Sequence, residues 1–401
     1  MKSLITRENI WLFLVGFTLC SFAGSERINS WGIIAICLFT VVDINLIDKI
    51  KKTIWLKNTV PMFTFFGVYL LFFLFSERDA DATHALVSKL SFFLLPAAFT
   101  IENYFTKKNE QLLMLVFSMA LSISLGYQIS SSLLDNYFLA KSPNLSLAFN
   151  RIYVSSYIMH PGYFSAFLLT GIIWHTIQRN KYSLLFISIF TIGIIILLSR
   201  IVILIYALFF LSIGIQYIRN SANKLRNTFL LIFAFILSCF AVYQIPLVKH
   251  RIVATVENIN NTNKKINLES ATASRRITYE QELYLVFNKP LLGYGLGNAT
   301  KKLREHLTTK GYTALGKDMN THNQYVNTWM NTGIFGLLAL LTLLGSSFLY
   351  FKKNNRGVPL WLALMICFLL LTDDLLEIQA NCVFFALILS LYHTEKKITY
   401  S

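Results

Sequence analysis

Residues 182–218 read YSLLFISIFTIGIIILLSRIVILIYALFFLSIGIQYI, and Arg200 is the only charged residue of this stretch. A helix needs about 20 mainly apolar residues to cross the hydrocarbon core of a bilayer. The stretch is long enough for two such helices, at 182–198 and 201–218, with almost no loop between them. It therefore predicts two adjacent membrane spans with an arginine at the turn that joins them.

The whole chain has the composition of a membrane protein. Of its 401 residues, 55% are hydrophobic and only 14% are charged, whereas soluble domains carry about 25% charged residues. So few charged side chains cannot cover a soluble protein of this size, which disfavours a soluble all-helical protein. Apolar blocks recur along the sequence and predict an all-α integral membrane protein with about 12 transmembrane helices. The predicted spans are 10–24, 31–47, 59–75, 85–101, 111–130, 159–177, 182–198, 201–218, 227–245, 323–351, 358–372 and 375–393.

The distribution of Lys and Arg predicts the topology. With an even number of spans, both termini lie on one side, and placing them in the cytoplasm puts 18 of the 36 Lys and Arg residues in cytoplasmic segments. Six lie in short external loops or at span edges, and 12 lie in one long external loop. Cytoplasmic loops are enriched in positive residues, and long loops are exempt from this rule. The net charge of +16 is therefore explained by topology and not by nucleic-acid binding.

The predicted organisation is a single membrane domain, residues 1–401, with a long external loop at 246–322 between spans nine and ten. A loop of this length usually carries function or is disordered. This loop contains a helical pattern at 277–288 and a glycine-rich run, so we expect it to be partly helical. The first apolar block could also be a signal peptide, but a retained helix is favoured because the rest of the chain is membrane-embedded.

Neither a metal nor another cofactor is expected. Asp79-Ala80-Asp81 has a spacing that some glycosyltransferases use for a metal, but a solvated acidic loop is the favoured interpretation. The run from Gly293 to Gly297 lacks the Lys-Ser/Thr of a phosphate-binding P-loop and is interpreted as a turn. The cysteines lie in apolar segments without metal-ligand spacing and are interpreted as packing residues. They are Cys20, Cys37, Cys239, Cys367 and Cys382.

Three arginines are candidates for binding an anion. Arg200 lies at the external end of a span, where an arginine needs an anionic partner or a wet cavity. The alternative is a charge that only sets topology. Arg275 and Arg276 open an amphipathic stretch of the long loop, and the planar guanidinium can hold phosphate oxygens through two hydrogen bonds. Alternatively, they hold that helix against anionic lipid headgroups.

His322 is the candidate for acid–base chemistry. It lies where the long loop re-enters the membrane, within Asn320-Thr321-His322-Asn323-Gln324. A histidine can take a proton from a sugar hydroxyl near neutral pH, or orient that hydroxyl. The alternative is a histidine that caps the start of a helix.

The order of these features resembles the O-antigen ligase and polymerase family of bacterial membrane glycosyltransferases, in detail over about residues 155–350. The motifs that carry the resemblance are Ser199-Arg200, Ser274-Arg275-Arg276-Ile277-Thr278-Tyr279, Asn288-Lys289-Pro290-Leu291-Leu292-Gly293-Tyr294-Gly295-Leu296-Gly297-Asn298, Thr321-His322-Asn323-Gln324-Tyr325 and Thr332-Gly333-Ile334-Phe335-Gly336-Leu337-Leu338. Many members have glycine after the first arginine, where this chain has Ile201. Glu377-Ile378-Gln379 resembles a polar patch found in some relatives.

The resemblance implies a metal-independent transfer of a glycan from undecaprenyl diphosphate at the periplasmic face of the bacterial inner membrane, among membrane lipids. The acceptor is lipid A–core in ligases and another lipid-linked glycan in polymerases. It assigns His322, Arg200 and either Arg275 or Arg276 to catalysis. It also assigns to substrate binding the residues Arg200, Arg275, Arg276, Asn323 and Gln324.

The expected function is that of an O-antigen ligase-type glycosyltransferase. In it, His322 would orient or deprotonate the acceptor from the face of the sugar opposite the diphosphate, and the transfer would invert the anomeric centre. A polymerase shares this chemistry and is the nearest alternative. A secondary transporter with 12 spans is the alternative from another class, and it is disfavoured because the two halves of the chain do not match.

Overall fold

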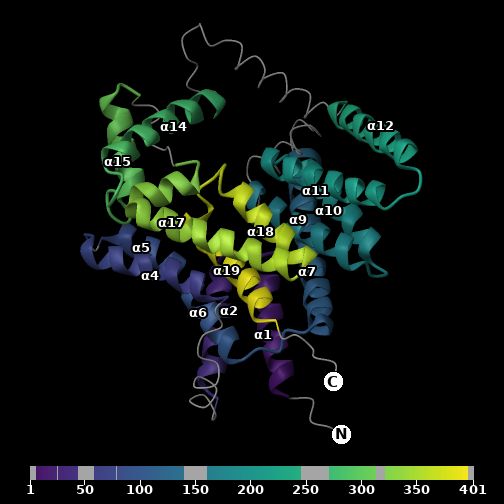
Figure 1. The fold of residues 1–401 in the computed structure, drawn as a ribbon, viewed down its shortest axis with the longest axis horizontal. Helices are drawn as coiled ribbons and strands as arrows, with labels where there is room; N and C mark the ends of the chain where they lie inside the picture. Colours follow the sequence, from purple (N-terminus) through teal and green to yellow (C-terminus); the bar gives the residue numbers. More distant parts are fainter. Residues whose placement is uncertain are drawn as a thin grey trace. The chain divides into compact units, whose positions relative to one another are not determined.

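The computed structural model of the chain describes residues 6–24, 26–43, 58–77, 79–139, 160–244, 271–312 and 321–395. All regular structure within these residues is helical, as predicted (Figure 1). The chain divides into two compact units. The first unit comprises Met1–Ser124, Thr170–Ile187 and Ile277–Ser401, and the second comprises Leu125–Leu169 and Ser188–Arg276.

Most helices lie within one of the two units. The first unit contains α1 (Arg7–Ser21), α2 (Glu26–Val41), α4 (Val60–Phe75), α5 (Ala80–Lys89), α6 (Ser91–Ile101), α15 (Asn298–Thr309), α17 (Gln324–Lys353), α18 (Gly357–Leu369), the short η2 (Leu375–Glu377) and α19 (Gln379–Thr394). The second contains η1 (Leu134–Phe138), α11 (Arg200–Arg219) and α12 (Lys224–Tyr243). Residues of both units occur in α7 (Lys107–Leu133), α9 (Pro161–Gln178), α10 (Ser183–Leu197) and α14 (Ala271–Asn288).

The described helices have the lengths and composition of a membrane protein. Four stretches are long and apolar enough to cross a bilayer: Ala80–Ile101, Lys107–Phe138, Arg200–Arg219 and Gln324–Lys353. Shorter apolar helices lie at Ile28–Val41, Val60–Phe75, Ser183–Leu197 and Gly357–Leu369. These helices are consistent with a membrane protein, while the number of 12 spans stays a prediction. The helix expected at 277–288 is present as part of α14.

The first unit is built around α19, whose residues from Ala380 to Thr394 are all buried. This helix packs against α6, α2 and α18, while α17 packs against α4 and α18 (Figure 1). The rings of Phe22 and Phe384 meet edge to face, with centroids 5.1 Å apart, between α19 and the end of α1. An apolar helix enclosed on all sides forms the core of this unit.

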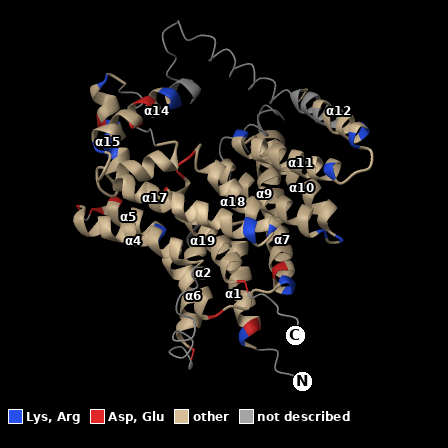
Figure 2. Ribbon diagram, in the orientation of Figure 1, with Lys and Arg blue, Asp and Glu red and all other residues tan. Residues whose placement is uncertain are grey.

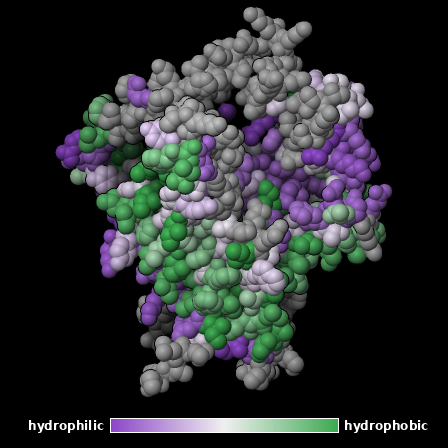
Figure 3. Space-filling view, turned by 180° about the vertical axis from the view of Figure 1, so that it is seen from behind, coloured by the Kyte–Doolittle hydropathy of each residue, from purple (hydrophilic) through white to green (hydrophobic). Residues whose placement is uncertain are grey.

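The outer surface carries many large apolar side chains. Phe13, Trp31 and Phe75 are 70%, 67% and 84% exposed, and hydrophobic residues cover broad areas of the face seen in Figure 3. Charged residues lie mostly near the ends of helices and in their connections (Figure 2). Apolar surfaces of this extent need a lipid or protein environment, so these side chains fit contact with the bilayer.

The glycine-rich run forms a turn that docks into a break in α17. Gly333 interrupts that helix with φ 63° and ψ −163°. The backbone N–H of Tyr294 donates to the carbonyl of Met330 at 2.7 Å, and that of Ile334 donates to the carbonyl of Pro290 at 3.0 Å. Gly293 also has a positive φ, and a Cβ on either glycine would overlap a backbone carbonyl of the opposite segment. Glycine is needed here for both conformation and close approach.

Candidate functional site

His322 lies directly before α17 and faces a carboxylate. Its Nδ1 atom is 3.7 Å from Oδ1 of Asp373, which belongs to the connection between α18 and α19, and its side chain is 30% exposed. This is an ion-pair distance, slightly longer than a hydrogen bond. A carboxylate at Nδ1 favours the tautomer that leaves Nε2 able to accept a proton. The pair therefore has the composition of a general base and its orienting group.

Asp373 and Asp374 share the connection between α18 and α19 with Glu377. The backbone N–H of Asp374 donates to Oδ1 of Asp373 at 3.1 Å. Burial, together with the charge of Asp373, raises the pKa of Asp374 to about 8. Burial also raises the pKa of Asp373, but its interactions with His322 and Asp374 outweigh that effect and bring its pKa below the ordinary value. The negative charge of the pair thus resides on Asp373, beside His322.

A buried row of hydroxyl and amide groups links Asp374 to α15. The Thr321 hydroxyl donates to Oδ2 of Asp374 at 3.1 Å. Asn327 donates from Nδ2 to the Thr321 oxygen at 2.5 Å, and Asn331 donates to Oδ1 of Asn327 at 2.7 Å. The backbone N–H of Ala299, in the first turn of α15, donates to Oδ1 of Asn331 at 3.3 Å. Residues four apart on a helix lie on one face, so α17 presents these amides together.

The predicted substrate-binding amides make hydrogen bonds within the protein. Asn323 caps α17, because its Oδ1 accepts from the backbone N–H groups of Tyr325 and Val326 at 3.0 and 3.3 Å. The buried side chain of Gln324 accepts from the backbone N–H of Leu376 at 2.7 Å. Direct contact of these side chains with a substrate stays a prediction.

Lys89 forms a buried ion pair with Glu377. The Lys89 ammonium lies 2.9 Å from Oε1 of Glu377, and the lysine side chain is 0% exposed. The amide of Gln324 donates to the same oxygen at 3.3 Å. The sequence places Lys89 at the external edge of a span, where it counts as a topological charge. In the structure it anchors the connection between α18 and α19 to α5.

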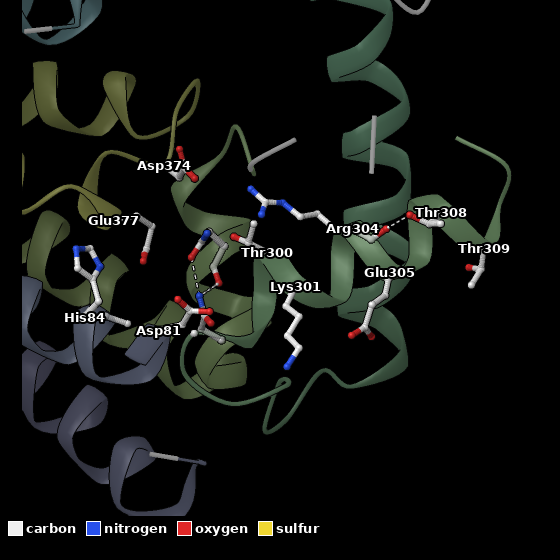
Figure 4. A pocket seen from close by; sticks show the side chains of 14 residues that line it. Asp81, His84, Thr300, Lys301, Arg304, Glu305, Thr308, Thr309, Asp374 and Glu377 are labelled. Carbon is white, nitrogen blue, oxygen red and sulfur yellow. Dashed lines mark hydrogen bonds between the residues drawn. The ribbon is translucent and has the colours of Figure 1, made fainter. Parts of the chain in front are cut away.

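A polar cavity of about 760 Å³ lies beside this connection, between α5, α15 and the first turns of α17 (Figure 4). The side chain of Arg304 extends into it toward Asp374. Most small-molecule sites are lined by apolar groups, whereas this lining suits a ligand rich in hydroxyl groups. The lining residues are Asp81, His84, Ala85, Gly297, Thr300, Lys301, Arg304, Glu305, Thr308, Thr309, Asn327, Asn331, Asp374 and Glu377.

The three predicted anion-binding arginines belong to the second unit, whereas His322 belongs to the first. Arg200 is exposed and begins α11, directly after Ser199 and the left-handed Leu198 at φ 49°. Arg275 and Arg276 are exposed near the start of α14. Their roles in binding stay predictions.

The acidic motif Asp79-Ala80-Asp81 begins α5. Asp79 is its N-cap, because Oδ1 accepts from the backbone N–H of Ala82 at 2.8 Å. Asp81 lines the cavity. The polar patch near the end of the chain is divided between two contacts, since Glu377 pairs with Lys89 and Gln379 donates to the hydroxyl of Ser30 at 3.0 Å.

Sequence reasoning missed four charged residues of this region: Lys89, Glu282, Asp373 and Asp374. Asp373 and Asp374 do interrupt an apolar run, and acidic residues at a membrane boundary are a usable signal. They were assigned to the short gap between two predicted spans. Glu282 lies in a polar helical stretch where nothing in the sequence distinguishes it from Glu280.

The model of the protein family described as O-antigen ligase (Wzy_C) matches residues 184–341. This range contains Arg200, Arg275, Arg276, the glycine-rich turn and His322, so the resemblance found in those motifs is confirmed. No curated protein matches the chain.

Proposed function

We propose that this chain, whose residues 184–341 belong to the O-antigen ligase family, transfers a glycan from undecaprenyl diphosphate to a hydroxyl group of lipid A–core at the periplasmic face of the inner membrane. The observation that carries the proposal is the pairing of His322 with Asp373 beside a polar cavity. Both belong to the first unit, and the family match includes His322. The apolar helices and the family together favour a membrane glycosyltransferase over a transporter.

The proposed reaction is a single displacement at the anomeric carbon. The acceptor oxygen forms a bond to that carbon while the bond to the diphosphate oxygen breaks, and the bonding electrons leave with the diphosphate. Nε2 of His322 takes the acceptor proton, and Asp373 stabilises the resulting imidazolium. Attack from the face opposite the leaving group inverts the anomeric centre.

The leaving diphosphate needs positive charge, because its negative charge grows as the bond breaks. We assign this role to Arg200 and to Arg275 or Arg276, whose guanidinium groups can each hold two phosphate oxygens. The cavity lined by Asn327, Asn331 and Arg304 offers donors and acceptors to sugar hydroxyls. A polymerase would use the same groups and would differ in its acceptor.

The decisive experiment compares the surface glycans of a strain that lacks the protein with those of strains that carry variants. In the deletion strain, we expect lipid-linked long chains to accumulate while lipid A–core stays bare. Loss of long chains while single units still reach the core would identify a polymerase instead. Unchanged glycans would contradict both functions.

Two variants connect this phenotype to the site. His322→Ala and Arg200→Ala, made at normal levels, are expected to reproduce the deletion phenotype, with turnover reduced by about 10²- to 10⁴-fold for the histidine. Arg219→Ala is the matched control, because Arg219 is an exposed arginine at the other end of α11. Full transfer by the His322→Ala protein would exclude the proposed mechanism.

A further inference from the structure

The segment that leads from α14 into the glycine-rich turn exposes large apolar side chains. Phe287, Leu291 and Leu292 are 68%, 64% and 65% exposed. The carbonyl of Leu291 lies against Gly333, where a Cβ on that glycine would overlap it. The turn therefore directs its backbone toward α17 and leaves both leucine side chains on the surface. Exposed apolar side chains that gather in one place mark an interaction surface.

This turn docks where the character of α17 changes. Before the break at Gly333, the helix buries polar residues of the candidate site, among them Asn327 and Asn331. After the break, it is apolar and long enough to belong to a membrane span. There it exposes a stripe of large apolar residues on one face of the helix: Phe335, Leu338, Leu341 and Leu349. The bonds of the turn to Met330 and Ile334 place its leucines at the boundary between the two parts.

The other end of the turn contacts a second apolar helix. The backbone N–H of Leu296 donates to the hydroxyl oxygen of Ser76, directly after α4, at 3.1 Å. The last residues of α4, Leu74 and Phe75, are 53% and 84% exposed, and α4 packs against α17. The turn thus contacts two neighbouring apolar helices, and its leucines continue the apolar surface that these helices expose.

The residues around the leucines are those of a boundary between water and lipid. The indole N–H of Trp329 donates to the carbonyl of Pro290 at 2.8 Å, and its ring meets Phe287 edge to face. Lys289 is exposed, and its ammonium lies 5.1 Å from the ring centre of Tyr294. Trp and Tyr are enriched at membrane interfaces, and Lys can keep its charge at the headgroups while its stem lies along apolar surface. A lysine within the patch fits a lipid surface better than a protein partner, because the core of protein interfaces is depleted of charged residues.

We propose that the segment 287–292 is a membrane anchor within the long loop, with Phe287, Leu291 and Leu292 in contact with phospholipid acyl chains of the leaflet at which α17 begins. The anchored turn leads directly into α15, whose first turn bonds to Asn331 and which lines the polar cavity. The inference goes beyond the proposed function, because it gives the loop a lipid partner whatever reaction the cavity serves.

The test uses the full-length protein in nanodiscs of phosphatidylethanolamine and phosphatidylglycerol. The photoreactive residue p-benzoylphenylalanine replaces, in separate proteins, Leu292, Phe335 or the exposed Glu305 of α15, which is the matched control. Mass spectrometry after irradiation identifies the adducts. We expect phospholipid adducts at Leu292 and Phe335 with yields at least about tenfold above the yield at Glu305. A yield at Leu292 no higher than that at Glu305 would overturn the inference. Adducts at Leu292 that consist mainly of a polyprenyl lipid, or of a protein when native membranes are irradiated, would overturn it as well.

A second readout uses smaller substitutions, so it does not depend on how the protein tolerates the photoreactive residue. Leu292 is 65% exposed and the Glu305 side chain is 50% exposed, so a large difference in reactivity between them reports the surroundings. We expect a sulfonated maleimide to modify Leu292→Cys at least about tenfold more slowly than Glu305→Cys, because lipid excludes the charged reagent and disfavours the thiolate. Mass spectrometry of the peptide that contains each position separates these thiols from the native cysteines. Equal rates would contradict the anchor. Neither readout uses glycan transfer, so this inference and the proposed function can fail separately.

Discussion

Nδ1 of His322 and Oδ1 of Asp373 lie 3.7 Å apart, although one residue precedes α17 and the other follows α18. The backbone of Gln324 holds the two connections together, because its N–H donates to the carbonyl of Leu370 at 2.9 Å. A base and its orienting carboxylate therefore come from two segments that meet only in the folded protein. This relationship makes the role of Asp373 testable.

Asp373→Asn should slow transfer without removing the histidine. The amide keeps the size of the carboxyl group but cannot stabilise a positively charged imidazolium. We expect kcat to fall, by less than the roughly 10²- to 10⁴-fold that general acid–base catalysis contributes. Turnover of the purified protein measures the effect, and Asp135→Asn, at an exposed position on η1, is the control. Equal kcat values for the three proteins would remove Asp373 from the mechanism.

Lys89→Met should lower stability, because it leaves Glu377 without its counter-charge. Removing one partner of a buried ion pair costs roughly 3–5 kcal/mol, and the 24% exposure of the Glu377 side chain places the expected loss near the lower limit. The thermal midpoint in one detergent measures it, and Lys89→Met/Glu377→Gln should recover part of the loss. Lys301→Met, at an exposed lysine of the cavity, should leave the midpoint unchanged. An unaltered midpoint in Lys89→Met would show that this ion pair contributes little.

Gly333→Ala should destabilise the protein. A Cβ at this position would overlap the carbonyl of Leu291, and φ is positive. Strain of this kind costs about 1–3 kcal/mol. Gly345→Ala is the control within the same helix, because a Cβ there meets nothing within 4 Å, and alanine favours a helix by up to about 1 kcal/mol. Equal unfolding midpoints for the two variants would contradict the docked turn.

Stability should decrease as the pH rises from 6 to 9. The raised pKa of Asp374, about 8, means that the folded protein holds a proton that the unfolded chain releases at much lower pH. The stabilisation of the folded state by this proton is complete below the ordinary carboxyl pKa and is lost as the pH rises through about 8. The raised pKa of Glu282 also makes the stability decrease as the pH rises. Asp374→Asn should therefore reduce the slope of stability against pH without abolishing it. Unfolding midpoints across this pH range provide the measurement, with Asp81→Asn as the control. Identical slopes for wild type and Asp374→Asn would contradict a buried neutral Asp374.

Features that depend on local sequence could be predicted. The apolar blocks identify helices, because the length and apolar character of a span are properties of one segment. The glycine-rich run was correctly interpreted as a turn, since it lacks the residues of a phosphate-binding loop. The place of His322 at the end of the long loop indicates a candidate base, and that role stays a prediction. Each of these inferences needed only a short window of residues.

Features that depend on distant contacts could not be predicted. The burial of Lys89 follows from its pairing with Glu377, which lies in another part of the chain. Glu282 and Glu280 lie on the same helix, and Glu282 is on the buried face of α14 whereas Glu280 is on the exposed face. The contact of Asp373 with His322 forms only in the folded protein, so the sequence alone does not indicate a role for Asp373. All three of these features depend on tertiary packing, and the residue pattern of a single segment does not predict tertiary packing.

The contacts of Gln324 also bear on how the protein is made. Its N–H is satisfied by Leu370, and its side chain by Leu376 and Glu377. All three leave the ribosome after α17 itself. Polar groups at a helix end are costly in lipid until they find partners. The start of α17 therefore completes its hydrogen bonds only after the connection between α18 and α19 has been synthesised, which makes assembly of the site a late event in membrane insertion.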